Sequence, residues 1–65
     1  MKQEIPIWEK SNLTIEEAAA YFNIGIKKIR ELTDNQDSPY VLWIGSKRLI
    51  KRVPFENYLY TQYSI

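Results

Sequence analysis

The chain has 65 residues, with nine Lys or Arg, eight Asp or Glu and a formal net charge of +1. A chain this short buries only roughly 60% of the surface that its unfolded form exposes, so we expect one domain over residues 1–65 and no deep catalytic site. Cysteine and histidine are absent, which excludes disulfides and zinc-finger sites, and we expect no metal and no cofactor. No apolar run approaches the roughly 20 residues that span a bilayer, and the amino terminus lacks the apolar centre of a secretory signal. We therefore expect a cytoplasmic protein with no membrane partner.

The amino-terminal segment carries Ile5 and Ile7 on either side of Pro6, followed by Trp8. Proline in a sheet is largely confined to edge strands. We therefore predict that residues 5–8 form an edge strand of a sheet.

A first helix is predicted from Thr14 onward by the letters TIEEAAAYF. Thr14 and Glu17 have the spacing of a capping box, in which the two side chains satisfy backbone donors left free at a helix start. The small alanines allow a second helix to approach closely. Apolar side chains line one face at helical spacing, and they are Ile15, Ala18, Ala19 and Phe22.

Residues 23–25 interrupt this pattern and predict a tight turn. Gly25 tolerates the backbone angles of such a turn and can cap the helix that follows. In that second helix, helical spacing directs Ile29 and Leu32 toward the core. The second helix of a DNA-binding helix-turn-helix enters the major groove. The cations left pointing outward here are Lys27, Lys28 and Arg30.

Charge is polarised along the chain. Residues 26–52 hold seven basic and three acidic residues, a local balance of +4, whereas the rest holds two basic and five acidic residues, a balance of −3. If the basic segments share a face, they form an electrostatic footprint for phosphate. The alternative interpretation is an ordinary solvated surface.

A β-hairpin is predicted after the polar connector at residues 34–39. Residues 40–44 and 47–52 include aromatic and β-branched side chains, and the Gly45-Ser46 pair between them suits a type II′ turn. The cationic tip places Ser46, Lys47 and Arg48 where a winged helix contacts a minor groove or flanking phosphates. The alternative is a hairpin that completes the core, with edge-strand charges that oppose aggregation.

A final helix is predicted from Pro54, which suits a first helical turn. Residues 60–62 carry no charge, and they either present a protein-binding surface or form an ordinary solvated helix end. The residues at helical spacing, which we expect in the core, are Phe55, Tyr58, Leu59 and Tyr63.

The chain resembles the excisionase family of small winged-helix proteins in LTIEEAAAYFNIGIKKIREL, followed by WIGSKRLIKRVPFENYL. The letters IPIWEK before the first helix are similar to the excisionases of conjugative transposons that use a tyrosine integrase. The resemblance covers nearly the whole chain. It implies an α+β fold, with a helix-turn-helix, a hairpin wing and a carboxyl-terminal helix. It also implies a non-enzymatic accessory factor that binds double-stranded DNA near the ends of an integrated element, bends it and helps the integrase to assemble an excision complex.

The resemblance places the recognition helix at residues 25–33 and the wing tip at residues 45–48. Ile26 in this helix either contacts a thymine methyl or packs on the hairpin. Glu31 either accepts from a cytosine amino group or pairs with a neighbouring lysine. The residues that we predict to contact DNA are Thr14, Gly25, Ile26, Lys27, Lys28, Arg30, Ser46, Lys47, Arg48 and Lys51.

A monomer of this size would bury little surface on DNA, so we expect weak binding alone and cooperative binding beside integrase or further copies of the protein. One alternative is a winged-helix transcriptional regulator that acts on a promoter. A protein-interaction module that uses the tyrosine-bearing last helix and binds no DNA is another. An enzyme is disfavoured, because no nucleophile or paired-acid arrangement is present beyond carboxylates explained by capping and solvation.

Overall fold

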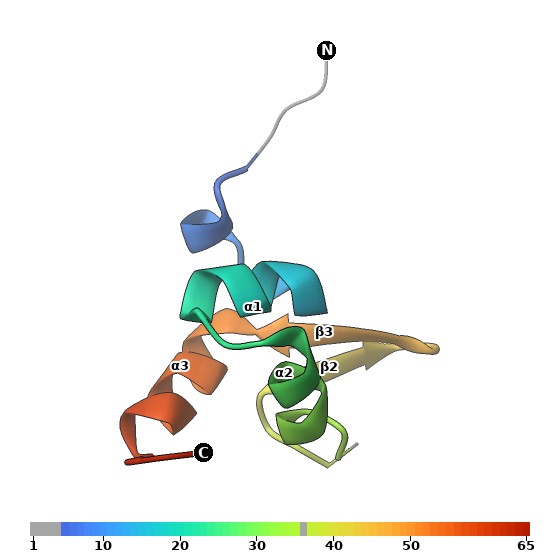
Figure 1. The fold of residues 1–65 in the computed structure, drawn as a ribbon. Coiled ribbons are helices and arrows are strands. Elements are labelled where there is room, and N and C mark those ends of the chain that lie inside the picture. The colour runs from blue at the N-terminus through green and yellow to red at the C-terminus, as the bar shows by residue number, and fades with distance from the viewer. Residues whose placement is uncertain (1–4, 36) are drawn as a thin grey trace.

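The computed structural model describes residues 5–35 and 37–65. Within these residues the chain forms an α+β domain with three α-helices and a three-stranded antiparallel sheet (Figure 1). The predicted helix-turn-helix, hairpin and carboxyl-terminal helix are all confirmed. The elements in chain order are a 3-10 helix η1 at Ile7–Glu9, β1 at Asn12–Leu13, α1 at Ile15–Phe22, α2 at Ile26–Leu32, β2 at Val41–Ile44, β3 at Lys47–Lys51 and α3 at Arg52–Tyr60.

The predicted capping box holds the start of α1. Thr14 Oγ1 accepts a hydrogen bond from the Glu17 backbone N–H at 3.1 Å, and Glu17 Oε1 accepts from the Thr14 N–H at 3.0 Å. The second Glu17 oxygen pairs with the Lys10 ammonium. The Lys10 contact, together with the hydrogen bond from Thr14, lowers the pKa of Glu17 below its ordinary value of 4.5. Ionised Glu17 therefore ties the segment before α1 to the first turn of this helix.

The turn between α1 and α2 is made by Asn23 rather than by Gly25. Asn23 has a φ of 57°, in the left-handed region, and the next residue, Ile24, donates its N–H to Ala19 O at 3.0 Å. Asparagine tolerates this conformation better than other side chains because it bonds locally to the backbone. Gly25 has a φ of −59° and serves as the amino-terminal cap of α2, as predicted. The prediction that Gly25 supplies the special backbone angles is wrong.

The sheet has the order β1-β3-β2, so β3 is its central strand. The hairpin register pairs Ile44 with Lys47 and Val41 with Ile50 across a two-residue loop. Gly45 has a φ of 61°, whereas Ser46 keeps a negative φ, which is the sign pattern of the predicted type II′ turn. In Figure 1 this β2–β3 hairpin, here called the wing, projects beyond the helices.

The edge strand lies at β1 and not at residues 5–8 as predicted. Residues 7–9 form η1, because Glu9 N–H and Lys10 N–H turn back to Pro6 O and Ile7 O at 2.9 and 3.0 Å. Leu13, paired with Ile50, is fully buried, whereas Ile5 and Trp8 are 58% and 63% exposed. Because Leu13 is buried in the core, Asn12 and Leu13 pair with β3 and residues 5–8 do not.

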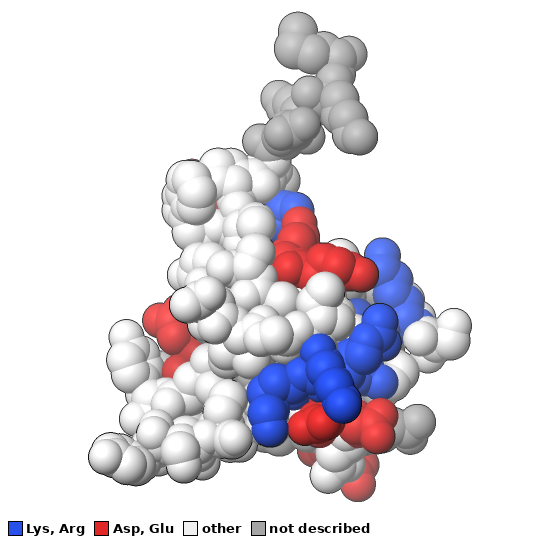
Figure 2. Space-filling view, in the orientation of Figure 1, with Lys and Arg blue, Asp and Glu red and all other residues white. Residues whose placement is uncertain are grey.

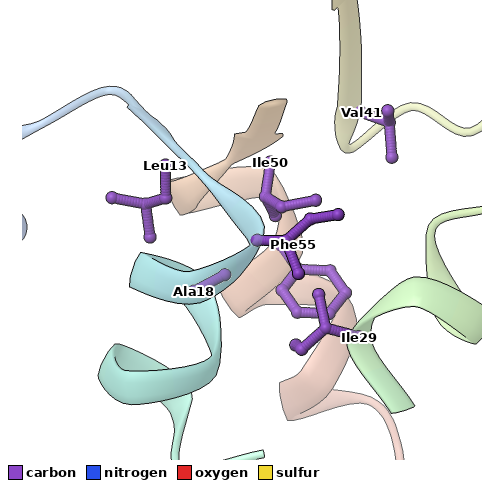
Figure 3. Close-up of a cluster of buried hydrophobic side chains, with 7 residues drawn as sticks. Leu13, Ala18, Ile29, Val41, Ile50 and Phe55 are labelled. Atoms are coloured by element: carbon purple, nitrogen blue, oxygen red, sulfur yellow. The ribbon is translucent and has the colours of Figure 1, made fainter. Parts of the chain in front are cut away.

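The core joins all three α-helices to one side of the sheet. Figure 3 shows the Phe55 ring pointing from α3 toward Ile29 of α2, with Ile50 and Ala18 nearby. Phe55, Ile29 and Ile50 are fully buried. Their burial removes the apolar surface that drives folding of so short a chain, so α2 and the wing rest on a common core.

The carboxyl-terminal helix matches its prediction except at its end. Pro54 lies in the first turn of α3, and Phe55, Tyr58 and Leu59 pack in or against the core. The helix ends at Tyr60, so Tyr63 lies beyond it and is fully exposed. The prediction that Tyr63 belongs to the core is therefore wrong, because the helical spacing does not continue to that residue.

Candidate nucleic-acid interface

The second helix separates its apolar and basic side chains as its spacing predicts. Ile29 is fully buried and Leu32 packs against the core. Lys27 and Arg30 are exposed, and the Lys28 side chain is 43% exposed. Lys28 Nζ lies 3.4 Å from Glu31 Oε1, so Glu31 pairs with a neighbouring lysine, which is one of the two interpretations of this acid. Three cations of α2 therefore face solvent.

The first residue of α2 is exposed and apolar. The Ile26 residue is 44% exposed and is not among the side chains packed against the core. Gly25 before it is also exposed, with open space where a Cβ would lie. The start of α2 therefore presents an uncharged surface next to the Lys27 side chain.

The tip of the wing carries a second group of cations. Ser46 and Lys47 are exposed, whereas the Arg48 side chain is only 15% exposed. Alternation along β3 places Lys47 and Lys51 on the side opposite Arg48 and the buried Ile50. The two successive basic residues at the tip therefore differ in environment.

The Arg48 guanidinium is bound by the end of α2. Nη1 donates to Arg30 O and to Thr33 Oγ1, each at 3.2 Å, and Nη2 donates to Asp34 Oδ1 at 3.3 Å. The guanidinium carbon lies 4.9 Å from the centroid of the Trp43 ring, on the paired strand. Arg48 is thus shared between the wing and the carboxyl end of α2.

An open hollow of about 280 Å³ lies where α1, α2 and the wing meet. Arg30 comes from α2, Lys47 comes from the wing, and Thr14 caps the start of α1, whose dipole is positive at that end. The residues that line the hollow are Thr14, Ile15, Glu16, Arg30, Trp43, Ser46, Lys47 and Arg48. Five of these eight are predicted site residues, so the fold brings together groups up to 34 positions apart in sequence.

The exposed cations form what we call the basic face, defined by Lys27, Lys28, Arg30 and Lys47. Figure 2 shows Lys and Arg side chains gathered over α2 and the wing, while the opposite flank in this view is mostly uncharged. In this view the cations of α2 and the wing share one face, whereas Lys51, which also belongs to residues 26–52, lies at the other end of β3.

Lys51 lies apart from the hollow. It pairs with Asn12 of β1 at the far end of β3 and lines a separate hollow of about 260 Å³ with Arg52, Val53 and other residues of that edge. The structure therefore groups nine of the ten predicted site residues around α1, α2 and the wing tip and leaves Lys51 at the base of the sheet.

Sequence reasoning missed Trp43 and Thr33, which hold Arg48 in place. Trp43 stands opposite Arg48 in the hairpin register, and this pairing follows from a two-residue loop at residues 45–46. Nothing local marks Thr33, which is fully buried and lies 15 residues from Arg48.

The described residues contain no cluster of three or more His, Cys, Asp or Glu side chains that could hold a metal ion. Nor does any helix among residues 5–35 and 37–65 have the length and hydropathy needed to cross a membrane.

Comparison with known proteins identifies the family. The family model for the excisionase from transposon Tn916 matches residues 1–65. The chain belongs to the Tn916 excisionase family. The excisionase from transposon Tn916 of Streptococcus agalactiae serotype V (strain ATCC BAA-611 / 2603 V/R) is 46% identical to this chain over 63 residues, which cover 94% of each protein. Membership of the excisionase family confirms the resemblance found in the sequence and the prediction of a non-catalytic accessory protein.

Proposed function

We propose that this protein binds double-stranded DNA at the ends of its mobile element, bends that DNA and thereby promotes excision by a tyrosine integrase. The observation that carries the proposal is the convergence of Arg30 from α2 and Lys47 from the wing on one hollow. These two cations from separate elements outnumber Glu16, the one carboxylate among the described residues that line the hollow, and form a surface suited to the phosphate backbone of DNA.

In this proposal α2 enters the major groove. Arg30 is exposed on α2 and has the fork geometry that reads guanine, while exposed Ile26 can contact a thymine methyl. Lys27 extends from the same exposed side, where phosphates flank the groove. Lys28 is paired with Glu31, so its contribution to binding is reduced by the acid beside it.

The wing then follows the DNA backbone. Lys47 and Ser46 at its tip supply a charge and a hydroxyl. At the starts of α1 and α2, Thr14 supplies its hydroxyl and Gly25 its backbone N–H. Lys51 is too far along β3 to share the hollow, and as a DNA contact it would meet a more distant phosphate. The contacts to DNA therefore run from the recognition helix to the wing tip.

The bending of DNA in this proposal rests on membership of the excisionase family. A single DNA-binding module buries only roughly 600–1,000 Å² of its surface on DNA. Curving the duplex toward the wing adds backbone contacts, and these contacts offset the cost of deforming the DNA. We expect further copies of the protein, or the integrase, to stabilise the bend by binding beside it. Because its partner is cellular DNA, we expect the protein to act in the cytoplasm.

The test is a titration of the protein against duplexes from the two ends of its element and against scrambled duplexes of equal length, each labelled with a donor and an acceptor dye. We expect tighter binding to the end duplexes, with a change in energy transfer that reports bending, and excision by integrase that requires the protein. Equal binding to both duplexes with no bend would contradict the proposal. Tight binding upstream of a gene with no effect on excision would instead favour a transcriptional regulator.

A further inference from the structure

Arg48 differs from the exposed cations of the basic face because its side chain is held within the protein. Its side chain is 15% exposed and makes three hydrogen bonds to the carboxyl end of α2 and to Asp34 just beyond it. A guanidinium held in this way has few donors left for a phosphate. The cation at position 47 of the same strand, by contrast, is exposed at the wing tip.

Beyond Ile50 and Lys51, which pair with β1, the wing has only two strands, and a two-stranded hairpin is at most marginally stable by itself. Its base is anchored by Ile50 and Val41 in the core, but the strands continue beyond the core toward the tip. Within residues 5–35 and 37–65, the side-chain hydrogen bonds from β2 and β3 to the end of α2 and the two residues after it all start at Arg48. Nearer the base, Tyr40 just before β2 donates its hydroxyl to Leu32 O at 3.2 Å. The Arg48 guanidinium also lies over the ring of Trp43, which belongs to β2, the other strand of the wing.

Thr33 completes this arrangement from inside the protein. Its hydroxyl donates to Ile29 O at 2.7 Å and accepts from Arg48 Nη1 at 3.2 Å. The residue is fully buried, so it cannot touch DNA. The hydroxyl thus links a turn of α2 to the wing.

We propose that Arg48 is a positioning residue that locks the wing onto the carboxyl end of α2, with Thr33 as its buried partner, and that it does not itself contact DNA. This inference rests on the proposed function. The lock fixes the separation between Arg30 and Lys47, which must reach a base edge and a phosphate at the same time. Preorganised contacts of this kind raise affinity because less motion is lost on binding.

The test compares the wild-type protein with Thr33→Val and its matched control Thr33→Ser, which retains the hydroxyl. We expect Thr33→Val to weaken binding to the end duplexes by up to about tenfold, because losing one hydrogen bond to a charged group lowers the population of the locked wing, while Thr33→Ser binds nearly as the wild type does. Amide relaxation of residues 44–48 should show a more mobile wing tip in Thr33→Val alone. Circular dichroism must first show each variant folded at the temperature used.

Two further variants separate positioning from phosphate contact. Arg48→Lys keeps the charge but loses the planar fork, so we expect it to lose affinity as Arg48→Gln does. If Thr33→Val binds as the wild type does, or if Arg48→Lys retains full affinity, the positioning role is overturned while DNA binding stands. If the wild-type protein itself binds no DNA, the proposed function fails and the inference fails with it.

Discussion

Phe55→Ala is expected to lower the free energy of unfolding by more than any other single substitution considered for this domain. Phe55 is fully buried, and its ring centroid lies 5.1 Å from those of Phe22 and Tyr40, which belong to different parts of the chain. Truncating a buried phenylalanine costs about 3–5 kcal/mol. A domain of 65 residues is stable by only roughly 3–10 kcal/mol on typical per-residue values, so the loss removes between about a third and all of its stability.

Urea unfolding followed by circular dichroism measures this effect. Tyr60→Ala on the same helix is the matched control, because Tyr60 is 79% exposed and its loss should change the free energy of unfolding by less than about 0.5 kcal/mol. A Phe55→Ala variant that unfolds cooperatively at the wild-type midpoint would show that the core is not built around this ring.

Arg30→Ala is expected to have the largest effect on DNA recognition. If Arg30 reads a base in the major groove, its loss should cost about 1–3 kcal/mol in binding to the end duplexes and reduce the preference over scrambled DNA. The substitution keeps the backbone carbonyl that accepts from Arg48, so the wing remains attached to α2. The effect can therefore be assigned to the Arg30 side chain.

Arg30→Lys is the matched control in the same fluorescence titrations. It keeps the charge and loses the two-pronged geometry, so we expect it to bind scrambled DNA as the wild type does but to lose much of the preference for the end duplexes. Unchanged affinity and preference in Arg30→Ala would remove Arg30 from the DNA-binding site.

Local signals in the sequence predicted the elements that depend on neighbouring residues. The capping box joins Thr14 to Glu17 three positions later, and the type II′ turn needs only Gly45 and its flanking strands. Such features depend on which residue types stand at a fixed spacing, and this spacing can be read directly from the sequence. The predicted elements that contained them are confirmed.

Features that depend on distant residues could not be predicted in this way. The partners of Arg48 lie 14 to 18 positions away, so an arginine at a hairpin tip gives no sign that α2 binds it. The edge strand was expected near Pro6, but the burial of Leu13 against Ile50 decides which residues join the sheet. Local patterns did not distinguish Asn23 from Gly25 either, because both residue types tolerate the left-handed turn.

The salt dependence of DNA binding by wild-type protein and Lys47→Ala tests most directly whether the basic face binds the DNA backbone. Each phosphate contact contributes about −0.9 to the slope of log affinity against log salt concentration. We expect a steep wild-type slope, a slope shallower by about one contact in Lys47→Ala, and the wild-type slope in Lys47→Arg. A wild-type affinity that does not change with salt, or equal slopes in wild type and Lys47→Ala, would contradict a DNA-contacting wing.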